Sequence, residues 1–151
     1  MNRIFVDADA CPVKDEVYRV ADRYQWQVVV VANMWLRVPD HPRVSRVIVA
    51  EGPDAADDWI VEHAAEGDVV VTADVPLADR CVKTGARVLG PAGKAFTPSS
   101  IGSDLAMRNL MTSLRETGEI RGGGRPFSKD DRSRFLVALD NAVQAIRRTG
   151  R

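Results

Sequence analysis

The chain has 151 residues, of which 45% are hydrophobic and 28% are charged, a composition typical of a globular domain and unlike that of disordered or fibrous chains. The 21 basic and 21 acidic side chains cancel, which excludes the overall positive field of a strongly basic nucleic-acid-binding protein. The length predicts a single domain over residues 1–151, with an α/β core over residues 1–92 and a helical part over residues 93–151.

Over the first 92 residues, short apolar runs alternate with segments that have the spacing of amphipathic helices. The apolar runs predict strands at residues 4–6, 28–32, 44–50, 69–72 and 87–89. The patterns between them predict helices over residues 12–24, 55–65 and 76–83, where Pro12 and Pro76 suit the first helical turn. This alternation predicts an α/β fold with a mostly parallel sheet of about five strands and helices on both faces.

The rest of the chain predicts two further helices. The first has an apolar stripe at helical spacing, formed by Met107, Leu110, Met111 and Leu114. The second begins at a capping box of Ser128 and Asp131, and its apolar stripe consists of Phe135, Leu139, Ala142 and Ile146. We expect these two helices to pack along the edge of the sheet or to reach across its functional end.

The cysteines and the N-terminal residues argue against several other classes of protein. Cys11 and Cys81 belong to no Cys/His cluster, which argues against a structural zinc site. Two carboxylates interrupt the first apolar run, as they would not in a signal peptide. The longest aliphatic stretch, residues 28–32, is far shorter than the about 20 residues of a membrane helix. We therefore expect a cytoplasmic protein with no membrane partner.

Six aspartates are predicted to gather at one edge of the sheet, because ligands of open parallel sheets bind at the carboxyl ends of the strands. Asp7 and Asp9 follow the first strand, and Asp74 follows the fourth. The helix after the third strand begins at the same edge, and its first turn carries Asp54, Asp57 and Asp58. The i, i+3 and i, i+4 spacing of these three places them on one face of that helix.

Carboxylates crowded together repel one another, and a divalent cation relieves that repulsion. Oxygen ligands without His or Cys favour Mg²⁺ or Mn²⁺ over zinc, and the chemistry such a site suits is hydrolysis of a phosphodiester bond. Other roles stay open for individual residues. Asp9 could cap the first helix, Asp54 suits an N-cap better than a ligand position, and Asp58 could be solvated surface.

Five segments of the chain resemble the YaiI/YqxD family of small bacterial proteins. They are FVDADACP at residues 5–12, VAN at 31–33, LRVP at 36–39, DAAD at 54–57 and GDVVVTADVPLA at 67–78. The resemblance extends over almost the whole chain. It implies a PIN-like three-layer fold, since the family is placed among PIN-like domains, a superfamily that contains metal-dependent nucleases.

The resemblance also implies roles for particular residues. Asp7, Asp57 and Asp74 match the metal-binding acidic positions of the PIN pattern, and Asp9 belongs to the motif of the YaiI/YqxD family itself. The implied catalytic and metal-binding set is therefore Asp7, Asp9, Asp57 and Asp74, with Asp54 and Asp58 as secondary acidic residues.

Basic and aromatic side chains suggest a nucleic-acid partner for this edge. Lys14 and Arg37 could contact phosphate beside the acidic rim. Residues 108–151 carry 10 basic and 5 acidic side chains, and Arg108 and Arg125 could form part of a track for RNA or another single-stranded nucleic acid. Trp35 could stack on a base or cover an edge of the core.

We therefore expect a Mg²⁺- or Mn²⁺-dependent nuclease that acts on RNA. Two alternatives stay open: a non-catalytic module that binds nucleic acid or protein, and a phosphatase in which Asp7 attacks phosphorus. The phosphatase motif continues with Thr or Val at the position where this chain has Cys11, which weighs against that alternative.

Overall fold

A single six-stranded sheet forms the centre of the protein, in a computed structural model that describes residues 2–9, 11–49, 52, 54–119 and 126–149. Its strands are β1 (Arg3–Asp7), β2 (Gln27–Ala32), β3 (Val44–Ile48), β4 (Val69–Val71), β5 (Arg87–Leu89) and β6 (Ala95–Phe96). They lie in the order β3-β2-β1-β4-β5-β6, and all neighbours are parallel except β5 and β6. The five predicted strands are confirmed. The antiparallel β6 was not predicted, because two residues are too few to show a periodicity.

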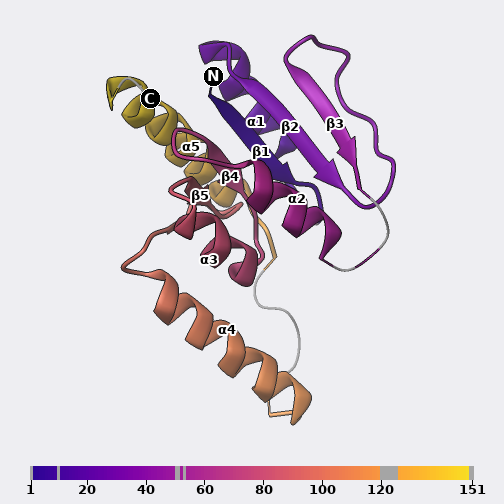
Figure 1. The fold of residues 1–151 in the computed structure, drawn as a ribbon. Coiled ribbons are helices and arrows are strands. Elements are labelled where there is room, and N and C mark those ends of the chain that lie inside the picture. The colour runs from indigo at the N-terminus through magenta and orange to yellow at the C-terminus, as the bar shows by residue number, and fades with distance from the viewer. Residues whose placement is uncertain (1, 10, 50–51, 53, 120–125, 150–151) are drawn as a thin grey trace.

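Helices cover both faces of the sheet, as predicted, and make three layers (Figure 1). The helices of the described residues are α1 (Lys14–Tyr24), α2 (Ala55–His63), α3 (Val75–Lys83), α4 (Ile101–Glu116) and α5 (Lys129–Thr149). α1 and α5 pack on one face, and α2 and α3 pack on the other. The described residues 33–43, which join β2 to β3, contain no helix.

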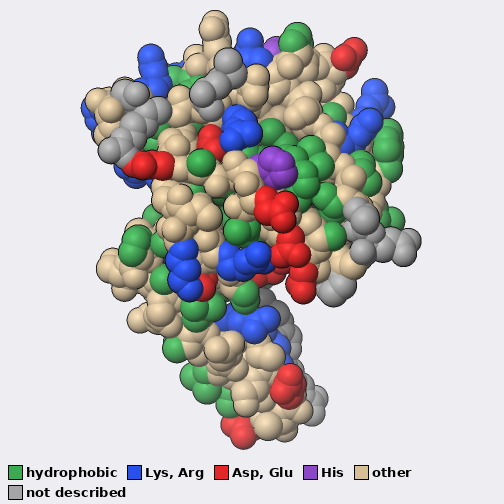
Figure 2. Space-filling view, in the orientation of Figure 1, with side chains coloured by type: hydrophobic (Ala, Val, Ile, Leu, Met, Phe, Trp, Pro, Cys, Tyr) green, Lys and Arg blue, Asp and Glu red, His purple; other side chains and the backbone are tan. Residues whose placement is uncertain are grey.

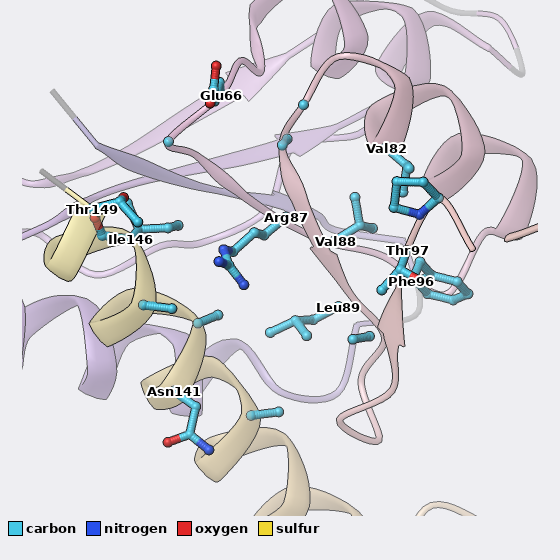
Figure 3. A pocket seen from close by; sticks show the side chains of 18 of the residues that line it. Glu66, Val82, Arg87, Val88, Leu89, Phe96, Thr97, Asn141, Ile146 and Thr149 are labelled. Atoms are coloured by element: carbon cyan, nitrogen blue, oxygen red, sulfur yellow. Dashed lines mark hydrogen bonds between the residues drawn. The ribbon is translucent and has the colours of Figure 1, made fainter. Parts of the chain in front are cut away.

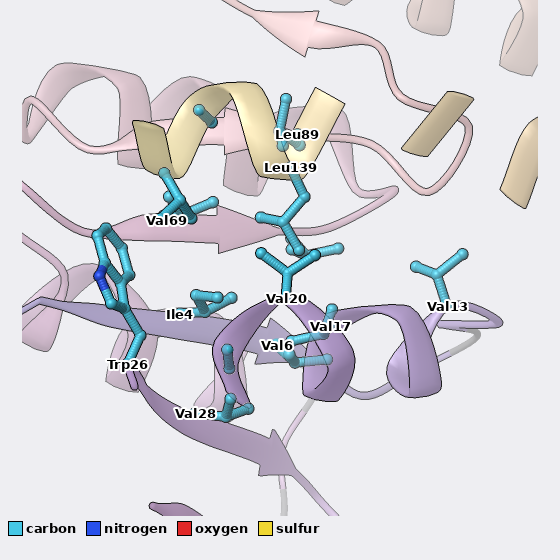
Figure 4. Packing of buried hydrophobic residues seen from close by; sticks show 14 of the residues in the cluster. Ile4, Val6, Val13, Val17, Val20, Trp26, Val28, Val69, Leu89 and Leu139 are labelled. Atoms are coloured by element: carbon cyan, nitrogen blue, oxygen red, sulfur yellow. The ribbon is translucent and has the colours of Figure 1, made fainter. Parts of the chain in front are cut away.

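The two faces of the sheet have separate apolar cores, because successive side chains of a strand point to opposite faces. In β1, Ile4 and Val6 pack beneath α1 and α5, while Phe5 packs beneath α2 and α3. The central strands are buried on both faces, which explains why they have continuous apolar runs rather than alternation. Figure 4 shows the first core, where Val17 and Val20 of α1 and Leu139 of α5 meet the strands.

The last helix, α5, lies on the face of the sheet beside α1, not along the edge. The predicted capping box is present at its start: the Ser128 backbone N–H donates to Asp131 Oδ2 at 2.9 Å, and the Asp131 N–H donates to Ser128 Oγ at 3.1 Å. The four residues of its predicted apolar stripe are buried. Gly93, in the turn after β5, lets this helix approach closely, since a Cβ there would lie 2.8 Å from the Arg134 carbonyl oxygen.

α4 departs from the sequence expectation, because its apolar stripe is not buried. The helix packs on α3 and projects away from the rest of the protein (Figure 1). Met107 is 58% exposed and Leu110 is 51% exposed. The expectation that both C-terminal helices lie along the edge of the sheet or across its functional end is therefore wrong. Among the described helices, none combines the length and apolar character needed to cross a membrane.

Replacing Leu139 by Ala should lower the free energy of unfolding by about 2–5 kcal/mol, because the side chain is fully buried between α5 and the sheet and its removal leaves a cavity. Urea unfolding followed by circular dichroism measures the change. Val137→Ala is the matched control on the same helix, since Val137 is 60% exposed and its loss should change stability by less than about 0.5 kcal/mol. Equal effects of the two substitutions would contradict the packing of α5.

Candidate functional site

Three of the predicted site residues lie where strands end and helices begin. Asp7 is the last residue of β1, Asp74 is the N-cap of α3 just after β4, and Asp57 is in the first turn of α2. β1 and β4 are paired and parallel, so their carboxyl ends lie at the same edge of the sheet. In Figure 1, α2 lies near the arrowheads of the strands.

Asp7 is a buried carboxylate, only 7% exposed. Burial raises the pKa of Asp7, and the charges of Asp9 and Asp74 raise it further. Two hydrogen bonds oppose this shift: one from the Thr72 hydroxyl to Asp7 Oδ2, at 2.8 Å, and one from the backbone N–H of Asp9. The two hydrogen bonds therefore offset part of the cost of burying this carboxylate.

Thr72 was not among the predicted site residues, although it connects two of them. Its hydroxyl donates to Asp7, and the same oxygen accepts a hydrogen bond from the Asp74 backbone N–H at 3.0 Å. Thr72 is 2% exposed, so these two bonds satisfy a hydroxyl that water cannot reach. The sequence signal for this role is a hydroxyl at the end of an apolar strand, two residues before an aspartate.

Asp74 has a structural role that the sequence analysis did not anticipate. Asp74 Oδ1 accepts a hydrogen bond from the Leu77 backbone N–H at 3.0 Å and so caps α3. The residue is exposed. One side of its carboxylate is thus fixed by the helix, which orients the group at the edge of the sheet.

Asp57 has the most perturbed carboxylate of the set, with its pKa raised to about 6. Burial is the largest cause, followed by the negative charges of Asp74, Asp7 and Asp54, while Arg80 opposes the shift. These three negative charges act on Asp57 from separate segments of the chain. Asp7, Asp57 and Asp74 therefore share one electrostatic neighbourhood, as their positions in the sequence predicted.

The other three aspartates lie at the rim. Asp9 is exposed, and it does not cap α1, which begins after Val13. Asp54 occupies the N-cap position of α2, but its side chain makes no capping hydrogen bond, so the favoured capping role is wrong. Asp58 forms an ion pair with Arg80 at 2.9 Å. Figure 2 shows acidic side chains gathered over α2, next to basic side chains over α3.

No ion pair involves Asp7, Asp57 or Asp74 in the described part of the chain. Both cysteines are buried thiols, and burial raises the pKa of Cys81 to about 12, so a thiolate nucleophile is not available there. The chemistry of this edge therefore depends on carboxylate oxygens.

The basic residues predicted to contact phosphate are dispersed. Lys14 donates from Nζ to the Cys11 carbonyl oxygen at 3.0 Å, and Arg37 is exposed in the loop after β2. Arg108 is exposed on α4, where it bonds Asn109. Arg125 lies outside the described residues.

The acidic edge fits a divalent cation by its donor chemistry, but it is not a closed cage. Across residues 2–9, 11–49, 52, 54–119 and 126–149, no three His, Cys, Asp or Glu side chains are grouped so as to hold a metal ion. Mg²⁺ needs no such group, because it keeps several waters and uses one or two carboxylates together with substrate phosphate. Asn33, at the end of β2, adds a buried Oδ1 that has no hydrogen-bond partner among the described residues.

A separate cavity of about 780 Å³ lies between α5 and β5 (Figure 3). Its lining includes Arg87 of β5 and Asn141 of α5, and none of the predicted site residues lines it. The carboxylates with raised pKa values and this cavity are thus in different parts of the protein.

Comparison with known proteins gives the family of the chain. The sequence model described as "Uncharacterized BCR, YaiI/YqxD family" matches residues 5–145. The chain belongs to the YaiI/YqxD family. It is 61% identical to a UPF0178 protein of Rhodopseudomonas palustris over 148 residues, which cover 98% of this chain and 94% of that protein. It is 60% identical to a UPF0178 protein of Nitrobacter winogradskyi over 146 residues, 97% of this chain and 93% of that protein. The matched residues 5–145 include all six of the aspartates described above, and the names of these two relatives state no activity.

The raised pKa of Asp57 has a consequence for stability in metal-free buffer. The folded state holds this proton more tightly than the unfolded chain, so the stabilisation is present below about pH 4 and is lost as the pH rises through about 6. Asp57→Asn stays neutral and should raise the Tm at pH 7.5, by about 2–4 °C for each kcal/mol gained, but not at pH 4. Thermal unfolding at the two pH values measures the difference.

Asp58→Asn is the matched control for this experiment. It removes a neighbouring charge from the same helical turn, but Asp58 is paired with Arg80, so its loss should not raise the Tm at pH 7.5. A pH-independent effect of Asp57→Asn would contradict the electrostatic coupling.

Proposed function

We propose that this YaiI/YqxD-family protein hydrolyses phosphodiester bonds in RNA with Mg²⁺ or Mn²⁺ at the edge formed by Asp7, Asp57 and Asp74. The observation that carries the proposal is the coupling of these carboxylates: the charge of Asp74 raises the pKa values of Asp7 and Asp57, the charge of Asp7 raises that of Asp57 further, and none of the three forms an ion pair among the described residues. Structural carboxylates are commonly paired, whereas unpaired carboxylates with raised pKa values are typical of sites that bind a cation or transfer a proton. The resemblance to PIN-like domains supports the same reaction.

Some residues of the chain would bind the cation, and others would orient its ligands. Asp7 and Asp57 are the best direct ligands, because they are the two carboxylates whose pKa values are raised. A bound cation would favour their ionised forms, which burial and neighbouring negative charges disfavour. Thr72 fixes the orientation of Asp7 through its hydrogen bond. Asp74, fixed at the start of α3, adds negative charge at the same edge, and Asp9 lies at the open rim.

When bound, Mg²⁺ or Mn²⁺ would activate a water molecule and neutralise charge on the scissile phosphate. The exposed Asp9 and Asp74 leave this edge open to a polymeric substrate, in contrast to an enclosed pocket that would accept only a small molecule. This openness favours a nuclease over a phosphatase acting on a small phosphate ester.

Asp57→Asn should lower the Mn²⁺-dependent cleavage of labelled single-stranded RNA by at least about 100-fold, because a lost ligand weakens both cation binding and charge stabilisation. Gel analysis of RNA and single-stranded DNA panels measures the rate. Glu62→Gln, which removes a charge from the exposed far part of α2, is the control and should cleave as the unaltered protein does. The nuclease proposal fails if pure protein cleaves nothing, or if both variants cleave equally.

Cation binding can be tested without turnover. Mn²⁺ should raise the Tm of the unaltered protein, since a ligand that binds only the folded state stabilises it, and EDTA should reverse the rise. Asp57→Asn should show a much smaller rise, and Glu62→Gln a full one. RNA binding that is unaffected by chelator, together with no Mn²⁺ effect on Tm, would instead favour a non-catalytic binding module.

A further inference from the structure

We propose that Trp35 is a stacking platform for an unpaired base, and that Arg37 and Arg46 beside it bind the adjoining phosphates of a single-stranded nucleic acid. The inference rests on the proposed function, because the nucleic-acid strand bound at Trp35 would be the substrate that is cleaved at the acidic edge. It is carried by different residues, which lie in the loop after β2 and on β3.

The platform begins next to the acidic edge. Asp7 of β1 is paired in register with Val31 of β2, and the Ala8 backbone N–H donates to the Val31 carbonyl oxygen at 3.0 Å. Trp35 is four residues beyond Val31, and four residues span at most about 14 Å. A strand that lies across the carboxyl ends of β1 and β2 can therefore reach both the aspartates and the indole ring.

Trp35 is 69% exposed, which decides between the two roles that the sequence left open. It does not cover an edge of the core, whereas Trp26, at the start of β2, is 6% exposed and does pack into the core. Met34 beside it is 78% exposed. Adjacent large apolar side chains in water are typical of binding surfaces.

The exposed ring is held in place by its neighbours. Leu36 and Val38 pack against the core, so the alternating residues Trp35 and Arg37 face outward. Arg46 donates from Nη1 to the Leu36 carbonyl oxygen at 3.0 Å, and its guanidinium lies 4.9 Å from the centre of the Trp35 ring. The ring is therefore oriented before any ligand binds, which lowers the entropy cost of stacking.

The charge around the ring matches a polyanion. Arg37 and Arg46 form no ion pair within the described residues, and both are exposed. Arg37 also lines a shallow hollow together with Lys14, on the side of α1. Aromatic rings among basic side chains are the usual means of binding single strands, where bases stack and phosphates meet the cations.

A second copy of the chain is a poorer occupant of this surface. A two-fold contact through Trp35 would bring the Arg37 and Arg46 side chains of both copies together, and like charges at an interface are unfavourable. A duplex is also a poorer occupant, because its bases are already stacked within the helix. The surface therefore selects an unpaired strand, with little preference for base sequence.

Binding of fluorescein-labelled RNA measured by anisotropy in EDTA tests the platform without cleavage. Trp35→Ala should weaken the Kd for single-stranded RNA by about 5- to 150-fold, the range expected for one lost stacking contact. Trp35→Phe should keep most of the affinity, since it keeps an aromatic face. Val137→Ala is the control, an exposed apolar side chain on α5, and should change the Kd less than twofold.

Two further RNAs separate stacking from charge. An abasic oligonucleotide of the same length should bind the unaltered protein and Trp35→Ala equally, and the annealed duplex should bind more weakly than the single strand. The inference is overturned if Trp35→Ala leaves the Kd unchanged, if the duplex binds as tightly, or if sedimentation shows that Trp35→Ala converts a dimer to a monomer. These results concern binding alone, so they stand whether or not Asp57→Asn abolishes cleavage.

Discussion

The parallel pairing of β1 with β4 is the constraint on which the rest of this protein depends. It brings Asp7 and Asp74, which are 67 positions apart in the chain, to one edge of the sheet. Pairing in the antiparallel sense would send them to opposite ends. The same pairing allows Thr72 to bond both residues, so a single register of two short strands determines the arrangement of the acidic edge.

Gathering and burying carboxylates at this edge costs free energy, and the packing of the surrounding fold offsets that cost. Burial and mutual repulsion oppose ionisation of Asp7 and Asp57, and the described part of the chain offers no ion pair that compensates. The apolar packing on both faces of the central strands supplies stability that offsets this cost. Arg80 offsets only part of this cost at Asp57, and the proposed cation would offset the rest.

Much of this organisation could be predicted from residue patterns. The strands with continuous valine runs and the Ser128–Asp131 capping box were predicted at or near their observed positions, because local patterns determine them. The place of α4 could not be predicted, since an apolar stripe at helical spacing looks the same whether or not a partner covers it. Which aspartate caps its helix could not be predicted for a similar reason: Asp54 and Asp74 both precede a helix, and only the backbone geometry decides which side chain reaches the N–H groups.

The two outer strands of the sheet have a consequence for self-association. β6 is only two residues long, and the opposite outer strand, β3, presents the exposed side chains of Ser45 and Arg46. Long, flat and apolar border strands invite another chain to add to the sheet, whereas short or charged ones discourage it. Both borders of this sheet are therefore poor templates for fibril growth, and its valine-rich centre stays enclosed between the two helical layers.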